Sequence, residues 1–236
     1  MHSASCFVTL TYSDETVPLD GSLCKRDVTL FMKRLRKKTG KRLRYMLVGE
    51  YGDQTHRPHY HLLLYGEDFK ADRQLWRDGK NPLYTSKLLE ETWGKGYAPI
   101  GELTFDSAAY VARYAMKKIN GKRKTEHYRR RTADCTWDLT PEFSVMSRKP
   151  GLGKAWLKKY WRDVYTDDHV IFKGRKYPPP KRYDAWMYQE NPYLMFWIRA
   201  RREARLEDSN DEWTLDRLAA AKKVVDRQLS EFARYL

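Results

Sequence analysis

The chain has 236 residues, with 46 Lys and Arg against 31 Asp and Glu, and its formal net charge of +15 points to a polyanionic partner such as nucleic acid. The length suits one sizeable α+β domain with a smaller appendage, and three scattered cysteines without a CxxC pair argue against a disulfide scaffold or a zinc ribbon. The chain has no leader-like start and no stretch of ~18 apolar residues, so we expect a soluble protein that stays in the cytoplasm, with no membrane partner.

The first 119 residues alternate between strand-like and helix-like patterns. Seven elements are expected there: strands at 6–12, 43–51, 59–66 and 100–105, and helices at 25–38, 86–93 and from 106 or 107 to 119. A short polar turn separates the second and third strands, which predicts an antiparallel hairpin.

The pattern is less regular after residue 119. Residues 120–131 are polar and basic and are expected to form a loop. A strand at 143–146, a helix at 154–165 and a small hairpin at 170–177 follow. Three prolines at 178–180 mark a boundary before two helical stretches at 192–207 and 212–236. We therefore expect one domain at 1–165 and a mostly helical extension at 166–236.

His59 and His61 are predicted to lie in the third strand. Because strand side chains alternate, both imidazoles face the same side, roughly 7 Å apart at the backbone, and Tyr60 faces the other side. Glu50, near the end of the neighbouring strand, offers the oxygen ligand that a hard divalent ion prefers. Three ligands leave positions open for water or phosphate, as in a catalytic site. The alternative is a pair of hydrogen-bonded histidines on a sheet face without a metal.

Two tyrosines lie four residues apart in the helix predicted to end at residue 119. Tyr110 and Tyr114 share one helix face, and Lys117 and Lys118 extend it by a turn. Phenols beside an ammonium group suit phosphoryl transfer, because a metal-polarised phosphate accepts a phenol as nucleophile. The alternative is that both tyrosines are ordinary amphipathic packing.

Two segments concentrate positive charge. Residues 33–44 and residues 117–131 each carry eight basic residues. The first is expected to be a solvated helix face, and the second, with Tyr128, a clamp for single-stranded DNA. Residues 150–154 (PGLGK) lack the spacing of a phosphate-binding loop. The predicted DNA-binding residues are Arg57, Arg113, Lys122, Arg123, Lys124, Arg129, Arg130 and Arg131.

Five motifs follow in order: FVTLTY at 7–12, GEYG at 49–52, RPHYHLLLYG at 57–66, YVARYAMKK at 110–118 and MSRKPGLG at 146–153. Together they resemble the replication-initiation protein of gokushovirus-like Microviridae phages, which have small circular single-stranded DNA genomes. These initiators are HUH endonucleases, named for two histidines around a hydrophobic residue. The resemblance covers roughly the first 165 residues, which would then form the HUH endonuclease domain.

The resemblance implies a central antiparallel sheet of about five strands, flanked by helices, with the metal on one face and the tyrosine helix beside it. His59 and His61 match the histidine pair, and Glu50 matches the third ligand of a Mg²⁺ or Mn²⁺ ion. Tyr110 and Tyr114 match the paired nucleophiles, accompanied by Lys117 or Lys118.

The implied activity is nicking of a single-stranded phage origin through a 5′-phosphotyrosine, followed by rejoining, to initiate and terminate rolling-circle replication. Host helicase and polymerase are the implied partners, in the cytoplasm of a bacterial host, and no nucleotide cofactor is expected.

Three other functions remain open from the sequence. An HUH transposase or plasmid relaxase would use the same site on different DNA. A non-catalytic single-strand-binding regulator would have a structural histidine pair. A zinc-containing RNA-processing protein would act on RNA instead.

Overall fold

The computed structural model describes residues 2–52, 54–114, 123–208 and 214–232. Side chains of residues 114, 123–125, 208 and 228–232 lie outside this description. Contacts divide the chain into two compact units, residues 1–152 and 153–236. Among the described residues, no helix is long and apolar enough to cross a membrane.

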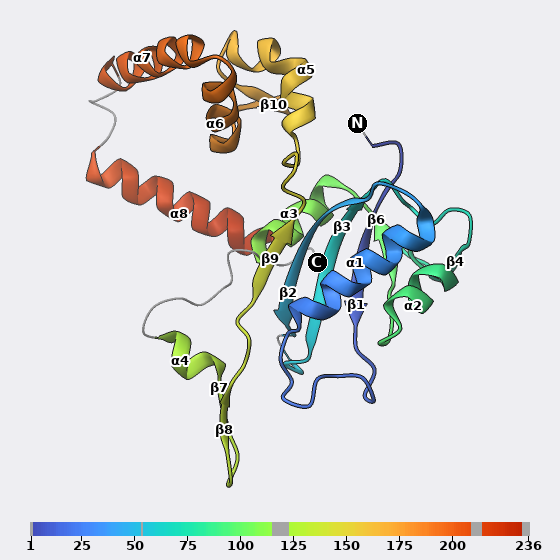
Figure 1. The fold of residues 1–236 in the computed structure, drawn as a ribbon. Helices are drawn as coiled ribbons and strands as arrows, with labels where there is room; N and C mark the ends of the chain where they lie inside the picture. The colour runs from blue at the N-terminus through green and yellow to red at the C-terminus, as the bar shows by residue number, and fades with distance from the viewer. Residues whose placement is uncertain (1, 53, 115–122, 209–213, 233–236) are drawn as a thin grey trace. The chain divides into compact units, whose positions relative to one another are not determined.

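The first unit is built on a seven-stranded antiparallel sheet in the order β4-β5-β6-β1-β3-β2-β9 (Figure 1). Its strands are β1 (Ser5–Thr11), β2 (Arg44–Tyr51), β3 (Pro58–Tyr65), β4 (Arg73–Arg77), β5 (Leu83–Ser86), β6 (Ile100–Glu102) and β9 (Phe143–Met146). The predicted hairpin is confirmed as β2–β3, and β1 pairs with the other edge of β3. The α+β class is therefore confirmed.

The sheet has seven strands rather than about five, because β4 and β5 extend one edge. The sequence pattern did not reveal them, for a physical reason. β4 is a short edge strand in which four consecutive residues are exposed, so it lacks the alternation that marks a half-buried strand.

One face of the sheet is covered by α1 (Lys25–Thr39) and α2 (Lys87–Trp93). Apolar residues of α1 recur at helical spacing, and Phe31 and Leu35 are fully buried against the strands. Gly40 ends α1 in the left-handed conformation, with φ of 65°, as a helix-terminating glycine does. This face holds the larger core of the first unit.

The opposite face carries α3 (Phe105–Tyr114) and a smaller apolar cluster. Val48 of β2, Leu63 of β3 and Val111 of α3 are its buried members. The predicted continuation of this helix to residue 119 falls on residues 115–119, which lie outside the described part of the chain.

The expectation of a loop at 120–131 is wrong for the part that the structure describes. Residues 123–128 form helix α4 (Arg123–Tyr128), and β7 (Arg129–Arg131) pairs with β8 (Thr136–Asp138) as a hairpin. Tyr128 anchors the segment, because its ring is buried and its hydroxyl donates to the Glu142 carboxylate. A single buried aromatic among charged residues carries no periodic signal, so the sequence pattern did not predict this structure.

The second unit is mainly helical. It contains α5 (Lys154–Tyr165), the hairpin of β10 (Val170–Phe172) and β11 (Arg175–Tyr177), α6 (Lys181–Glu190), α7 (Pro192–Asp208) and α8 (Leu215–Phe232). α5 and the hairpin were predicted, whereas α6 was not. The prolines at 178–180 lead into α6, with Pro180 at its N-cap, because proline is tolerated at a helix start.

By contacts α5 belongs to the second unit, since its Leu157 and Val164 pack with Trp186 and Met187 of α6. The contact boundary thus lies at residue 152. The assignment of residues 1–165 to the endonuclease and 166–236 to an extension stays a prediction about function.

Candidate metal centre

The centre lies on the α3 face of the sheet, where β2 and β3 pair in register. Glu50 of β2 stands directly opposite His59 of β3, and Val48 stands opposite His61. Because β3 side chains alternate, both histidines share this face and Tyr60 points into the α1 core, as predicted. Leu62 and Leu64 are buried in that same core.

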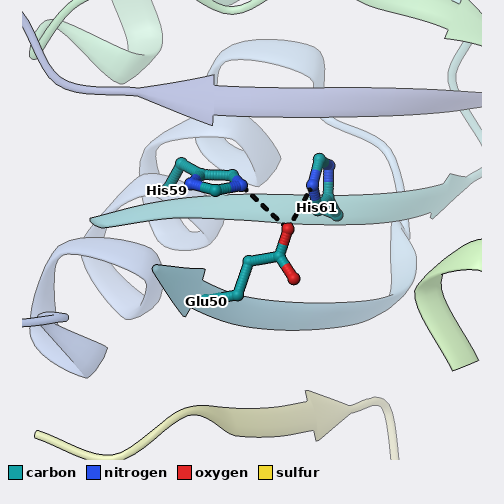
Figure 2. A group of neighbouring side chains, drawn as sticks. All are labelled: Glu50, His59 and His61. Atoms are coloured by element: carbon teal, nitrogen blue, oxygen red, sulfur yellow. Dashed lines mark hydrogen bonds and ion pairs between the residues drawn. The ribbon is translucent and has the colours of Figure 1, made fainter. Parts of the chain in front are cut away.

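The three side chains converge on one point (Figure 2). The Nε2 atoms of His59 and His61 lie 2.8 Å and 2.9 Å from the same oxygen, Oε1 of Glu50. Their potential ligand atoms all lie within 4.8 Å of one another. Two imidazole nitrogens and a carboxylate form a donor set suited to Mg²⁺, Mn²⁺ or Zn²⁺, and positions on such an ion remain open to substrate.

The hydrogen bonds behind the His59 ring determine which nitrogen faces Glu50 as a ligand. Its Nδ1 lies 3.1 Å from the backbone carbonyl of Arg57, which only accepts, so Nδ1 carries a proton. In neutral His59 the Nε2 lone pair then faces Oε1 of Glu50. Two electron-rich atoms at 2.8 Å require positive charge, from protonation of the ring or from a bound cation. This is the orientation of a metal-ligating histidine.

Glu50 supplies a second sign of fit. Among the described residues, its Oε2 is the buried side-chain atom without a hydrogen-bond partner. A buried carboxylate oxygen without a partner is costly, and a cation would compensate it. The residues present therefore fit a divalent ion.

The electrostatics of the centre favour charged Glu50 beside neutral His61. Burial alone would raise the pKa of the Glu50 carboxyl, but the hydrogen bonds with His59 and His61 outweigh burial and hold that pKa below its usual value. Burial lowers the pKa of His61. A neutral imidazole beside an ionised carboxylate is the protonation state in which both groups bind metal.

Tyr110 of α3 reaches this centre. Its ring centroid lies 5.1 Å from that of His61, in an edge-to-face arrangement, and 6.4 Å from the ring of Phe7. Tyr110 also packs against the small apolar cluster under α3, so it contributes to packing as well as standing beside the metal ligands. Tyr114 is the last residue of α3, but its side chain lies outside the described part, as do Lys117 and Lys118.

The predicted DNA-binding residues lie in different surroundings. The Arg57 guanidinium is held 2.5 Å from Asp14 and donates to the carbonyl of Tyr12, so it braces the end of β3. Arg113 lies in the last turn of α3. Arg129, Arg130 and Arg131 form β7, where Arg129 pairs with Asp138. Lys122 lies outside the described residues, as do the side chains of Arg123 and Lys124.

Two residues of β1 complete the surroundings of His61 and were not predicted. Thr9 Oγ1 lies 3.2 Å from Nδ1 of His61, and the ring of Phe7 stacks on the His61 ring with centroids 5.5 Å apart. Both lie on the metal face because β1 pairs Thr9 with His61. The alternation of residues 6–12 places Phe7, Thr9 and Thr11 on one face, a signal that could have identified them once β1 was placed beside β3.

Comparison with known proteins adds an independent line of observation. A model of the family described as replication-associated protein ORF2 matches residues 5–119, which include the metal-ligand candidates and α3. The chain is 31% identical over 248 residues to replication-associated protein VP4 of Bdellovibrio phage phiMH2K, covering 100% of this chain and 71% of that protein.

Two further relatives are similar over less of their own length. Replication-associated protein ORF2 of Spiroplasma virus 4 is 32% identical over 212 residues, with 84% of this chain and 62% of the relative covered. Replication-associated protein ORF4 of Chlamydia phage 1 is 29% identical over 192 residues, with 76% and 45% covered. No solved structure matches the chain.

Proposed function

The chain belongs to the replication-associated protein ORF2 family, and on that premise we propose that it is a metal-dependent endonuclease that nicks single-stranded DNA at a phage origin. The nick would start rolling-circle replication of a circular single-stranded genome in the cytoplasm of a bacterial host. The observation that carries the proposal is the convergence of Glu50, His59 and His61 on one point beside the ring of Tyr110.

Mg²⁺ or Mn²⁺, held by Glu50, His59 and His61, would polarise a non-bridging oxygen of the scissile phosphate and stabilise its developing charge. Around that ion the protein's own groups orient the ligands. The Arg57 carbonyl and Thr9 hydroxyl hold the two imidazoles by their Nδ1 atoms. Phe7 and Tyr110 flank His61 and restrict water on that side.

In the cleavage step, the Oη atom of one tyrosine forms a bond to phosphorus as the bond between phosphorus and the 3′ oxygen breaks. The phenol proton ends on the departing oxygen. The products are a 5′-phosphotyrosine and a free 3′-OH that primes a polymerase. Lys117 or Lys118 would offset negative charge at the phosphate.

After one round, the second tyrosine of the Tyr110 and Tyr114 pair cuts the regenerated origin. The newly freed 3′-OH then attacks the first phosphotyrosine. A phosphodiester forms, the bond between phosphorus and tyrosine breaks, and the phenol is regenerated. No nucleotide cofactor is needed, because the covalent intermediate conserves the phosphodiester bond energy. Host helicase and polymerase are the proposed partners.

The test is formation of a covalent adduct. Labelled single-stranded origin DNA of this phage group is incubated with the protein and Mn²⁺ and resolved on a denaturing gel. We expect a protein–DNA band that EDTA abolishes and that the double variant Tyr110→Phe/Tyr114→Phe loses. Tyr97→Phe, a change at an exposed tyrosine of the same unit, is the matched control and should retain the adduct.

Other outcomes would reassign the function. An adduct that survives in the double variant would place the nucleophile elsewhere. DNA binding without an adduct, indifferent to Mn²⁺ and to both tyrosines, would favour a non-catalytic single-strand-binding regulator. Cleavage of the same sequence as RNA but not as DNA would favour an RNA-processing protein. Adducts on transposon-end or plasmid-transfer DNA alone would favour a transposase or relaxase.

A further inference from the structure

Helix α7 of the second unit carries a row of exposed aromatic side chains. Tyr193, Phe196 and Trp197 have exposed fractions of 82%, 65% and 69%. Their spacing of three and four residues places them on one side of the helix. Met195 and Ile198, on the opposite side, are buried in the core of this unit. The helix is therefore firmly packed on one side and presents three rings to solvent on the other.

The chemical sorting within α7 is specific. Its aliphatic residues in this stretch face the core, whereas every large apolar residue that faces solvent is aromatic. A contiguous exposed apolar row marks an interaction surface more often than scattered apolar residues do. Flat rings without aliphatic neighbours suit a partner that offers flat faces of its own, such as unpaired nucleic-acid bases.

The charges beside the row are positive. Between Tyr193 and Arg202 the helix carries three arginines and no acidic residue. Arg202 is engaged by Asp168 and Asp184, and so does not contribute to the outer surface. Arg199 and Arg201 are exposed on either flank of the row, and the Arg199 guanidinium lies 5.0 Å from the ring of Tyr188, which is itself half exposed.

A pocket next to one flank adds further cations. It is lined in part by Arg201 and Arg205 of α7 and by Lys176 of β11. Two acidic residues also line it, and the carboxylate of one of them, Asp168, is held by Arg202 at 2.5 Å and 2.7 Å. The basic groups therefore outnumber the acidic ones here and offer an anion a place beside the aromatic row.

We propose that the outer side of α7 is a second binding surface for single-stranded DNA, in addition to the strand held at the metal centre. Bases stack on Tyr193, Phe196 and Trp197, and the phosphates between them pair with Arg199 and Arg201. The choice of DNA rests on the proposed function. Such a surface would retain the displaced or circular strand, independently of sequence, while the origin is cut and rejoined elsewhere on the protein.

Binding of a labelled thirty-nucleotide oligothymidylate in EDTA tests the proposal, because neither an origin nor a metal is then needed. Fluorescence anisotropy compares the wild-type chain with a triple variant, Tyr193→Leu/Phe196→Leu/Trp197→Leu. Leucine keeps the row apolar and removes the rings. We expect at least about a tenfold loss of affinity, since each ring–base stack contributes substantially to binding. Ile171→Ala, an exposed apolar change in the same unit, should leave the affinity unchanged.

A second variant, Arg199→Ala/Arg201→Ala, should weaken binding and reduce its dependence on salt. Wild-type affinity in the leucine variant would overturn the proposal. So would unchanged DNA binding in a triple alanine variant that loses self-association in sedimentation or loses binding to anionic vesicles, because the row would then serve a second copy or a membrane surface. The origin adduct, at saturating DNA, should form in the leucine variant, so failure of this inference and failure of the nuclease assignment are distinguishable.

Discussion

The two faces of the seven-stranded sheet share the same strands and differ in what their side chains do. On the α1 face, Tyr60, Leu62 and Leu64 of β3 are fully buried in the large core. On the α3 face, the same strand contributes His59, His61 and a much smaller apolar cluster around Leu63. Alternation along one strand thus separates stability from chemistry residue by residue.

The difference extends to hydrogen bonding. On the α1 face the Tyr60 hydroxyl is fully used: it accepts from the Cys24 amide and lies 2.9 Å from the Tyr12 hydroxyl, which itself donates to Asp27. Asp27 only accepts, so Tyr60 is the donor to Tyr12. On the α3 face Oε2 of Glu50 has no partner. A satisfied network stabilises the fold, whereas an unsatisfied carboxylate awaits a ligand.

The largest expected effect comes from breaking the metal face. His59→Ala should lower the rate of covalent adduct formation by about a thousandfold or more, because the ligand set loses one of its two imidazoles. Mn²⁺ should raise the melting temperature of the wild-type chain but not of the variant, since a ligand stabilises only the state that binds it. His2→Ala, at an exposed histidine, is the control. Full activity in His59→Ala would remove the metal centre from the mechanism.

The next effect comes from the opposite face of the same strand. Leu62→Ala should lower the free energy of unfolding by about 2–5 kcal/mol, the usual cost of a cavity at a buried leucine. Chemical denaturation measures this change. Adduct formation per folded molecule should stay near the wild-type rate. A loss of activity as steep as that of His59→Ala, at temperatures where the variant is folded, would show that the two faces are not separable.

The smallest effect sharpens the comparison at Tyr60. Tyr60→Phe should cost on the order of 1 kcal/mol, because it leaves the Cys24 amide without its 2.7 Å partner. Mn²⁺ affinity, measured by titration calorimetry, should stay within about twofold, since the ring still fills the α1 core. A large drop in Mn²⁺ affinity would instead mean that the Tyr60 hydroxyl positions the histidines on either side of it.

The same variant carries a pH signature. Burial raises the pKa of the Tyr60 hydroxyl in the folded protein to about 12, above the ordinary tyrosine value near 10. Between these two values the unfolded chain has lost the proton that the folded chain keeps, so stability present below about pH 10 declines as the pH rises toward 12. This alkaline decline should be shallower in Tyr60→Phe, and an identical decline in both proteins would assign it to other groups.

Local patterns predicted the elements that bury one regular face. The β2–β3 hairpin, the opposite orientations of Tyr60 and the two histidines, and the helix at 154–165 all follow from period-two or helical spacing, and the structure confirms them. Segments without such spacing were missed. The edge strand β4 is exposed, and α4 with the β7–β8 hairpin depends on the single buried ring of Tyr128.

The sequence by itself determined the donor set, the strand that carries the two imidazoles and the side of that strand to which they point, because these depend on residue type and backbone alternation alone. Only the tertiary structure decided that Glu50 stands opposite His59, that Thr9 and Phe7 from β1 surround His61, and that α3 brings Tyr110 to the same face. Strand register and helix docking arise from contacts between segments up to about a hundred residues apart, which no local pattern contains.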